Sequence, residues 1–164
     1  MNRRSKFLII FLLLAFFILN TIPIPILILE DLKASKIIFV HKVSPNDQFT
    51  IHWMHSVELA PWEEIFSIDD DCNIILDSTR FKAFGAGVPD AAGKKTVIKN
   101  GWIYFLNIDK DMPNLTYGIS NFAKHTFYFK NKTLKLYNMV PNDNPIKIYT
   151  KKISLLSYLY YKNI

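Results

Sequence analysis

The pattern of hydrophobic and polar residues changes along the chain from one long apolar run to short alternating segments. Residues 7–29 carry no charge, and these 23 residues are enough for a helix to cross a hydrocarbon core of about 30 Å. Residues 30–150 then hold short runs rich in β-branched and aromatic residues, separated by Pro, Gly, Asn and Asp. Such spacing is typical of a small antiparallel sandwich or a partly open barrel. We therefore expect an all-β fold on an N-terminal transmembrane helix.

The turn signals place the individual strands. Asn100-Gly101 predicts a type I′ hairpin turn, because both residues accept a positive φ. Residues 153–160 predict a short helix or a further strand. The chain thus divides into an anchor at 1–29, a β-domain at 30–150 and a basic, aromatic tail at 151–164. Strands are expected at 36–43, 48–57, 62–68, 73–84 (one strand or two), 96–99, 102–107, 115–119, 125–130, 134–137 and 146–150.

The segment 49–68 contains the most informative alternation. Its large apolar side chains fall at every second position on either side of four residues, 58–61, a length that hairpin loops use. A hairpin closed there places apolar residues opposite one another and leaves one polar pair among them. The sequence thus predicts a buried imidazole–carboxylate pair in the sheet core. The expected cross-strand pairs are Val57–Trp62, His55–Glu64, Trp53–Phe66 and Ile51–Ile68.

Two roles are open for the predicted His55–Glu64 pair. In the structural interpretation the two groups satisfy each other and fix the register, because a slip of one residue would expose the aromatic face. In the catalytic interpretation they act as general acid and base, with backbone amides of a glycine-rich loop stabilising an anion. The catalytic interpretation requires an accessible pocket that contains both side chains.

The neighbouring polar residues offer weaker candidates. His52 and Ser56 fall on the face opposite His55, because successive side chains of a strand point to opposite sides. A two-histidine metal site and a Ser–His nucleophile are therefore not expected, and we predict neither a metal nor a cofactor. Glu58 and Glu63 flank the loop and are expected in solvent. Alternatively, Glu58 projects from the hairpin tip and contacts a cation or a ligand.

A second candidate segment at 84–93 holds three of the five glycines. Gly85 and Gly87 stand at alternate positions, where they would let backbone N–H groups approach a ligand or form an anion-binding nest. A sharp corner between two sheet edges is the alternative. No nucleotide-binding loop is expected, because the segment lacks a third glycine in that motif and the Lys-Ser/Thr of a P-loop.

The net charge of +6 is unevenly distributed. Residues 1–29 hold three basic residues and no acid, and residues 30–123 hold thirteen acidic against nine basic residues. Residues 124–164 hold eight lysines and one aspartate. These lysines could rest on anionic lipid headgroups or guard exposed strand edges in solvent. Nucleic-acid binding is not expected, because Arg80 is the only arginine of the body.

A cleaved signal peptide is the alternative interpretation of the N-terminal apolar run. The apolar region of a signal peptide normally spans about 7–15 residues and ends at a small-residue site. Residues 7–19 fit that length, but no A-x-A-like site follows and the apolar run resumes at Ile22. Basic residues before the run and Glu30-Asp31 after it favour a cytoplasmic N-terminus. We therefore expect a single-pass cell-membrane protein with an extracytoplasmic β-domain.

Three motifs, in this order, resemble a bacterial family known as domain of unknown function 1850. They are H-S-V-E at 55–58, P-x-x-E at 61–64 and G-A-G at 85–87, and the pair Gly101-Trp102 follows. The resemblance covers residues 36–137. The positions that it marks, without an assigned role, are His55, Ser56, Glu58, Glu64, Gly85 and Gly87.

The resemblance also suggests a context. Members of this family are frequently encoded beside tripartite ATP-independent periplasmic (TRAP) transporters of the TAXI type. It therefore implies a membrane-attached, extracytoplasmic accessory or binding protein without an established enzymatic activity. Its partner would be a transporter subunit, the solute-binding protein or the small-molecule solute itself. The hairpin tip and the glycine loop would then form one binding surface. The alternative function is that of an extracytoplasmic enzyme that uses His55 and Glu64.

Overall fold

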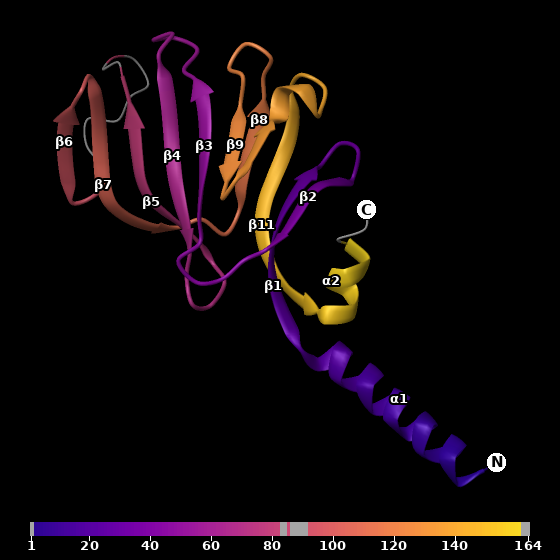
Figure 1. Cartoon of the computed structure of the whole chain (residues 1–164). Helices are drawn as coiled ribbons and strands as arrows, with labels where there is room; N and C mark the ends of the chain where they lie inside the picture. The colour runs from indigo at the N-terminus through magenta and orange to yellow at the C-terminus, as the bar shows by residue number, and fades with distance from the viewer. Residues whose placement is uncertain (1, 83–84, 86–91, 162–164) are drawn as a thin grey trace.

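The computed structural model describes residues 2–82, 85 and 92–161. Two antiparallel sheets face each other, with strand orders β2-β1-β11-β8 and β10-β9-β3-β4-β5-β7-β6 (Figure 1). The all-β prediction is confirmed, and the two packed sheets form its sandwich variant. The elements are α1 (Arg3–Thr21), β1 (Pro23–Asp31), β2 (Lys36–Lys42), β3 (Gln48–Met54), β4 (Pro61–Ile68), β5 (Ile74–Phe81), β6 (Lys95–Lys99), β7 (Trp102–Asp111), β8 (Leu115–Ile119), β9 (Thr126–Phe129), β10 (Lys132–Lys135), a 3₁₀ turn (Leu136–Asn138), β11 (Asn144–Ser154) and α2 (Leu155–Tyr161).

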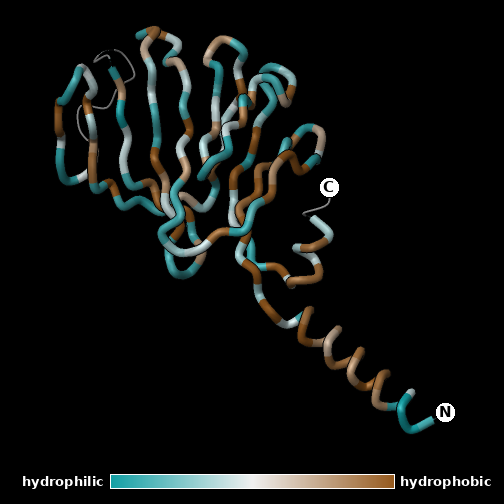
Figure 2. Tube along the Cα trace, viewed as in Figure 1, coloured by the Kyte–Doolittle hydropathy of each residue, from teal (hydrophilic) through white to brown (hydrophobic). Residues whose placement is uncertain are grey.

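The apolar N-terminal run divides between a helix and a strand. α1 ends at Thr21 rather than at Leu29, and Pro23 and Pro25 then lie in β1. Proline ends a helix because it lacks a backbone N–H and clashes with the preceding turn. The 19 residues of α1 make a helix of about 28 Å, and none of them is buried. Figure 2 shows this mostly hydrophobic helix standing clear of the sandwich.

β1 accounts for the rest of the apolar run because it is buried on both faces. Leu27 and Leu29 point into the core between the sheets. Ile26 and Ile28 point the other way, into a second cluster that includes side chains of α2. A strand covered on both sides has a continuous apolar sequence rather than an alternating one. The predicted anchor at 1–29 therefore extends too far and includes a strand of the β-domain.

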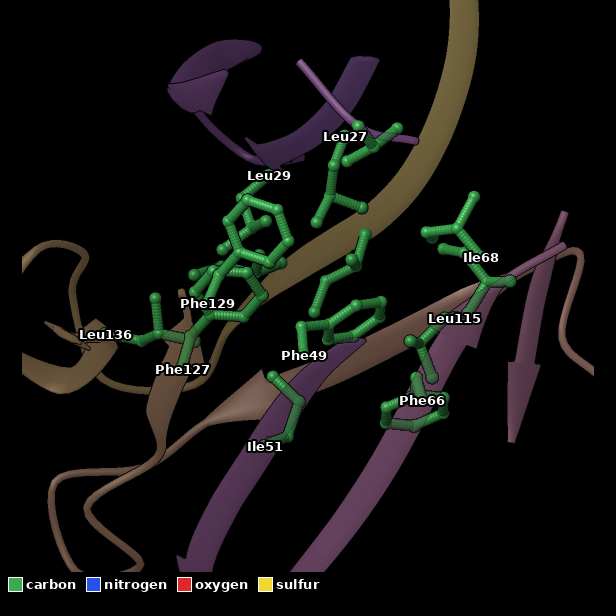
Figure 3. Packing of buried hydrophobic residues seen from close by; sticks show 14 of the residues in the cluster. Leu27, Leu29, Phe49, Ile51, Phe66, Ile68, Leu115, Phe127, Phe129 and Leu136 are labelled. Carbon is green, nitrogen blue, oxygen red and sulfur yellow. The ribbon is translucent and has the colours of Figure 1, made fainter. Parts of the chain in front are cut away.

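The main core lies between the two sheets (Figure 3). Phe49 and Phe66 of the larger sheet stack with ring centroids 4.9 Å apart, and Phe127 lies 5.5 Å from Phe49. Leu27 and Leu29 meet them from the smaller sheet. Each such side chain contributes about 1.5–3 kcal/mol when it is fully buried.

Most of the expected strands form close to their predicted positions. β8 spans Leu115–Ile119 as predicted. Asn100 and Gly101 have φ values of 53° and 72°, which confirms the predicted hairpin turn between β6 and β7. The last strand ends later than predicted, because β11 continues to Ser154, and α2 then packs on β1. The predicted boundary at residue 150 therefore falls inside β11.

The hairpin of β3 and β4 has a different register from the predicted one. Ile51 lies opposite Glu64, and Trp53 lies opposite Trp62. The connecting loop comprises residues 55–60, so His55 is a loop residue and the predicted cross-strand pair of His55 with Glu64 is wrong. Both registers keep the same side chains on the same face, so alternation alone could not distinguish them.

Candidate functional site

The loop that joins β3 and β4 lies at the end of the sandwich opposite α1 (Figure 1), and Gly85 lies against its residue Glu58. We call this region the loop end and define it as the hairpin loop 55–60, the loop 120–124 and Gly85. The hairpin loop is fixed by its own backbone, since His55 N donates to Ala60 O at 2.9 Å and Leu59 N donates to His55 O at 3.0 Å. Met54 N, at the end of β3, donates to Ala123 O at 2.7 Å and so joins the base of the hairpin loop to the loop 120–124.

A row of nearly parallel rings lies beneath the hairpin loop. The His55 ring stacks on Trp62 at 5.6 Å, and its Nδ1 accepts a hydrogen bond from Glu58 N at 3.3 Å. Trp62 stacks on Trp53 at 5.7 Å, and Trp53 stacks on His125 at 6.2 Å. We call these four side chains the ring row. Trp62 and His125 are buried while His55 and Trp53 are half-buried, so the row supports the loop from below and leaves part of its surface accessible.

His125 is a member of the ring row that the sequence analysis did not identify. Its Nδ1 accepts a hydrogen bond from Ser120 N at 3.2 Å. Burial lowers the pKa of His125, and a ring nitrogen that accepts a hydrogen bond carries no proton itself. The imidazole is therefore held neutral as a packing group. It carried no motif signal, because it is only the first residue of an expected strand and lies outside the three motifs.

Glu64 has a partner in the opposite sheet. Its side chain shares a face with Ile51 and points between the sheets, where the hydroxyl of Tyr117 in β8 donates to Glu64 Oε2. Burial raises the pKa of Glu64, and the Tyr117 hydrogen bond only partly offsets this. Burial also raises the pKa of Tyr117, and the negative charge of Glu64 adds to that shift. Tyr117 therefore remains a donor, and this hydrogen bond ties the two sheets together beside Trp53.

Glu58 and Gly85 bring two motifs into contact. The Glu58 carboxylate occupies the space that a Cβ atom on residue 85 would need. Glycine at position 85 is thus explained by the close approach of a side chain from the hairpin loop. Of the other marked positions, Ser56 is exposed at the hairpin tip, and Gly87 lies outside the described residues.

The opposite face of the same strands carries a separate polar cluster. His52, Glu63 and Arg80 are cross-strand neighbours on β3, β4 and β5. Arg80 Nη2 lies 2.5 Å from Glu63 Oε2, and His52 Nδ1 lies 3.3 Å from Glu63 Oε1. Burial works against ionisation of Glu63, but hydrogen bonds from His52 and Arg80 lower its pKa overall. The prediction that Glu63 is simply solvated is therefore wrong.

Apolar side chains are exposed around the loop end. Val57, Leu59 and Phe122 are 63%, 64% and 58% exposed. Leu59 and Phe122 also line a groove of ≈ 490 Å³ between the two loops, together with His52, Met54 and Lys124. Contiguous exposed apolar side chains are a mark of an interaction site.

His55 and Glu64 have separate partners in the structure. His55 is engaged by the loop backbone and Trp62, whereas Glu64 is engaged by Tyr117 in the other sheet. The acid–base pair required by the enzyme hypothesis is therefore not formed as predicted. Within residues 2–82, 85 and 92–161, no three His, Cys, Asp or Glu side chains are grouped to hold a metal ion.

The comparison with protein families finds a match for the sheet that carries the hairpin. The family model described as "Domain of unknown function (DUF1850)" matches residues 49–136, more than half of the chain. The match includes the hairpin of β3 and β4, Gly85, Tyr117 and His125, and it excludes α1, β1, β11 and α2. No curated protein and no solved structure matches the chain.

Proposed function

The chain belongs to the DUF1850 family, and we propose that it is a membrane-anchored accessory protein that binds a transporter subunit through its loop end. In this proposal α1 is an uncleaved anchor with a cytoplasmic N-terminus, and the β-domain lies on the extracytoplasmic side. The transporter is of the TRAP type, which is the context that the family resemblance implies. The partner surface belongs to its solute-binding protein or to an exposed part of a membrane subunit.

The proposal is carried by what two of the residues marked by the family resemblance do in the structure. His55 and Glu58 hold the shape of a loop that displays Val57 and Leu59 to solvent. The ring row fixes the base of this loop. A surface that is ordered before binding loses little conformational entropy when a partner is bound, which suits a docking site.

The position of α1 supports the same interpretation. β1 begins at Pro23, directly after the helix ends at Thr21, so the body would stand on the membrane surface without a long linker. The loop end lies at the far side of the sandwich from α1 (Figure 1). A partner that reaches it must project away from the bilayer, as a soluble solute-binding protein does.

Site-specific photo-crosslinking in native membranes tests this proposal. We would place p-benzoylphenylalanine at Val57 in the loop end and, as a matched control, at Ile98 of β6, which is 75% exposed. We expect an adduct with a subunit of the co-encoded transporter from position 57 only. Equal adducts from both positions, or none from position 57 together with unchanged solute uptake after gene deletion, would overturn the proposal.

A further inference from the structure

The outer face of the larger sheet carries two aromatic rings close to the turn between β6 and β7. Trp102 follows this turn directly, and Tyr104 lies two residues further on, so both side chains share one face of β7. Both are half-buried, whereas Phe105 points the other way and is fully buried. α1 and α2 lie on the side of the smaller sheet (Figure 1), so neither helix covers these rings. The pair Gly101-Trp102, which follows the three family-like motifs, thus belongs to a second surface.

Positive charges gather around the Trp102 ring. Arg80 Cζ lies 4.8 Å from the ring centroid, and Lys82 Nζ lies 5.1 Å from it. Lys99 is the cross-strand neighbour of Trp102 in β6. The face of an indole ring attracts cations through its quadrupole, and it so holds two like charges near one ring although they repel each other. We call Arg80, Lys82, Lys99, Trp102 and Tyr104 the Trp102 platform.

Only part of the charge on the Trp102 platform is neutralised. Glu63 pairs with Arg80, but Lys82 and Lys99 are exposed and form no salt bridge with another described residue. This positive excess is local, because residues 30–123 hold thirteen acidic against nine basic residues. Lysines on an edge strand discourage strand pairing, which accounts for Lys99 on β6. It does not account for Lys82, because β5 lies two strands in from that edge.

A continuous row of side chains connects the Trp102 platform to the loop end. The row lies on β3, β4, β5 and β7 and consists of the successive cross-strand neighbours His52, Glu63, Arg80 and Tyr104. Cross-strand neighbours share one face of a sheet. His52 also lines the groove between the hairpin loop and the loop 120–124, and Glu63 contacts both His52 and Arg80. The groove and the platform therefore lie on the same face of the larger sheet.

One partner can cover both parts of this face. The β6–β7 turn and the hairpin loop lie at the same end of the sandwich (Figure 1), and β7 is two strands from β4, roughly 10 Å across the sheet. A standard interface covers about 800 Å² of each partner, which is enough to include the groove and the platform. Ile98 points to the opposite face of β6 from Lys99, so it stays outside this surface as a crosslinking control.

We infer that the partner docked at the loop end presents an acidic surface, whose carboxylates lie against Lys82 and Lys99 on the Trp102 platform. This inference rests on the docking function proposed above and specifies the chemistry of the partner. Charges at the rim of an interface speed association and select among partners, while the apolar side chains of the loop end hold the docked partner. A basic surface at this position would be repelled.

The test uses the affinity-tagged full chain and measures how much of the co-encoded transporter subunit it recovers from detergent-solubilised native membranes. The variant Lys82→Gln with Lys99→Gln removes the two unpaired charges of the platform. Lys110→Gln with Lys132→Gln is the matched control, because these lysines are exposed on the same sheet toward its other end. Thermal unfolding of both variants should match that of the wild type. Recovery is compared at about 50 mM and about 500 mM NaCl, since salt screens exposed charges.

The outcomes separate this inference from the docking function. We expect the platform variant to recover several-fold less subunit than the wild type at low salt, with a smaller difference at high salt, and the control variant to follow the wild type. Equal recovery by the two variants would overturn the acidic-surface inference and leave the docking function standing. A wild-type chain that recovers no subunit at either salt concentration would overturn the docking function and the inference with it. Loss of the recovered subunit after nuclease treatment would show that nucleic acid bridges the two proteins, which also overturns the inference.

Discussion

At the scale of single residues, Glu64 is held by a hydroxyl group from the opposite sheet. A buried carboxylate is costly unless it is hydrogen-bonded, and Tyr117 supplies the donor. The residues on the hairpin serve different purposes within a few positions of one another. His55 shapes the loop, Glu58 covers Gly85, and Glu64 joins the sheets.

Removing the Tyr117 hydroxyl tests how far the buried Glu64 carboxylate depends on its hydrogen bond. Tyr117→Phe leaves the Glu64 carboxylate without its partner, so we expect the free energy of unfolding at neutral pH to fall by about 1–3 kcal/mol. Urea denaturation measures the change. Tyr128→Phe is the matched control on an exposed tyrosine, and it should change stability by less than about 0.5 kcal/mol. Equal effects of the two substitutions would contradict the role of Tyr117.

The pH dependence of stability tests Glu64 itself. Burial raises its folded-state pKa above the unfolded value, so the folded protein binds this proton more tightly. Stability from this group is therefore greatest below the unfolded pKa of about 4.3 and falls as the pH rises through the raised folded pKa. Glu64→Gln should remove that fall, so its gain in stability over the wild type should be larger at neutral pH than in acid. An unchanged pH profile in urea titrations would show that Glu64 is not buried as described.

Gly85 offers a test at the loop end. Gly85→Ala places a methyl group where the Glu58 carboxylate lies, and we expect Glu58 to move because its side chain is flexible. Thermal stability should change little, while the yield of the position-57 crosslink should fall. Gly118→Ala is the control, because a Cβ there meets no atom within 4 Å. A wild-type crosslink yield in Gly85→Ala would mean that the Glu58–Gly85 contact does not shape the docking surface.

At the scale of elements, the sequence predicted most strands but not the register of the central hairpin. Alternation determines which face a side chain occupies, and the β6–β7 turn was predictable because Asn100-Gly101 has a specific backbone requirement. The loop 55–60 has no such signal, since Leu59 adopts a positive φ of 50° without being Gly or Asn. The Tyr117–Glu64 bond joins residues from separate sheets, and local sequence patterns do not contain that information.

The division of the apolar run between α1 and β1 leads to a further prediction. Ile26 is fully buried in β1, whereas Leu12 in α1 is exposed. Ile26→Ala should therefore lower the free energy of unfolding of the β-domain by about 2–5 kcal/mol, and Leu12→Ala should leave it unchanged. Urea denaturation in detergent measures both. An Ile26→Ala protein as stable as wild type would indicate that residues 23–29 belong to the membrane helix after all.

At the scale of the whole molecule, the two ends of the sandwich have different surfaces. α1 and α2 gather apolar and basic residues at one end. The loop end carries Val57, Leu59 and Phe122 at the other (Figure 1). This difference between the two ends suits the proposal that the protein stands on a membrane and presents a preformed binding surface to a partner farther from the bilayer.

The most direct test of this arrangement is co-purification of the co-encoded transporter subunits from native membranes. The chain carries either Leu59→Ser with Phe122→Ser at the loop end or, as a control, Ile98→Ser in β6. All three side chains are exposed, so thermal unfolding should match that of the wild type in both variants. We expect the loop-end variant to lose most of the bound transporter subunit and the Ile98→Ser control to retain it. Retention of the subunit by the folded loop-end variant would contradict the proposed docking function.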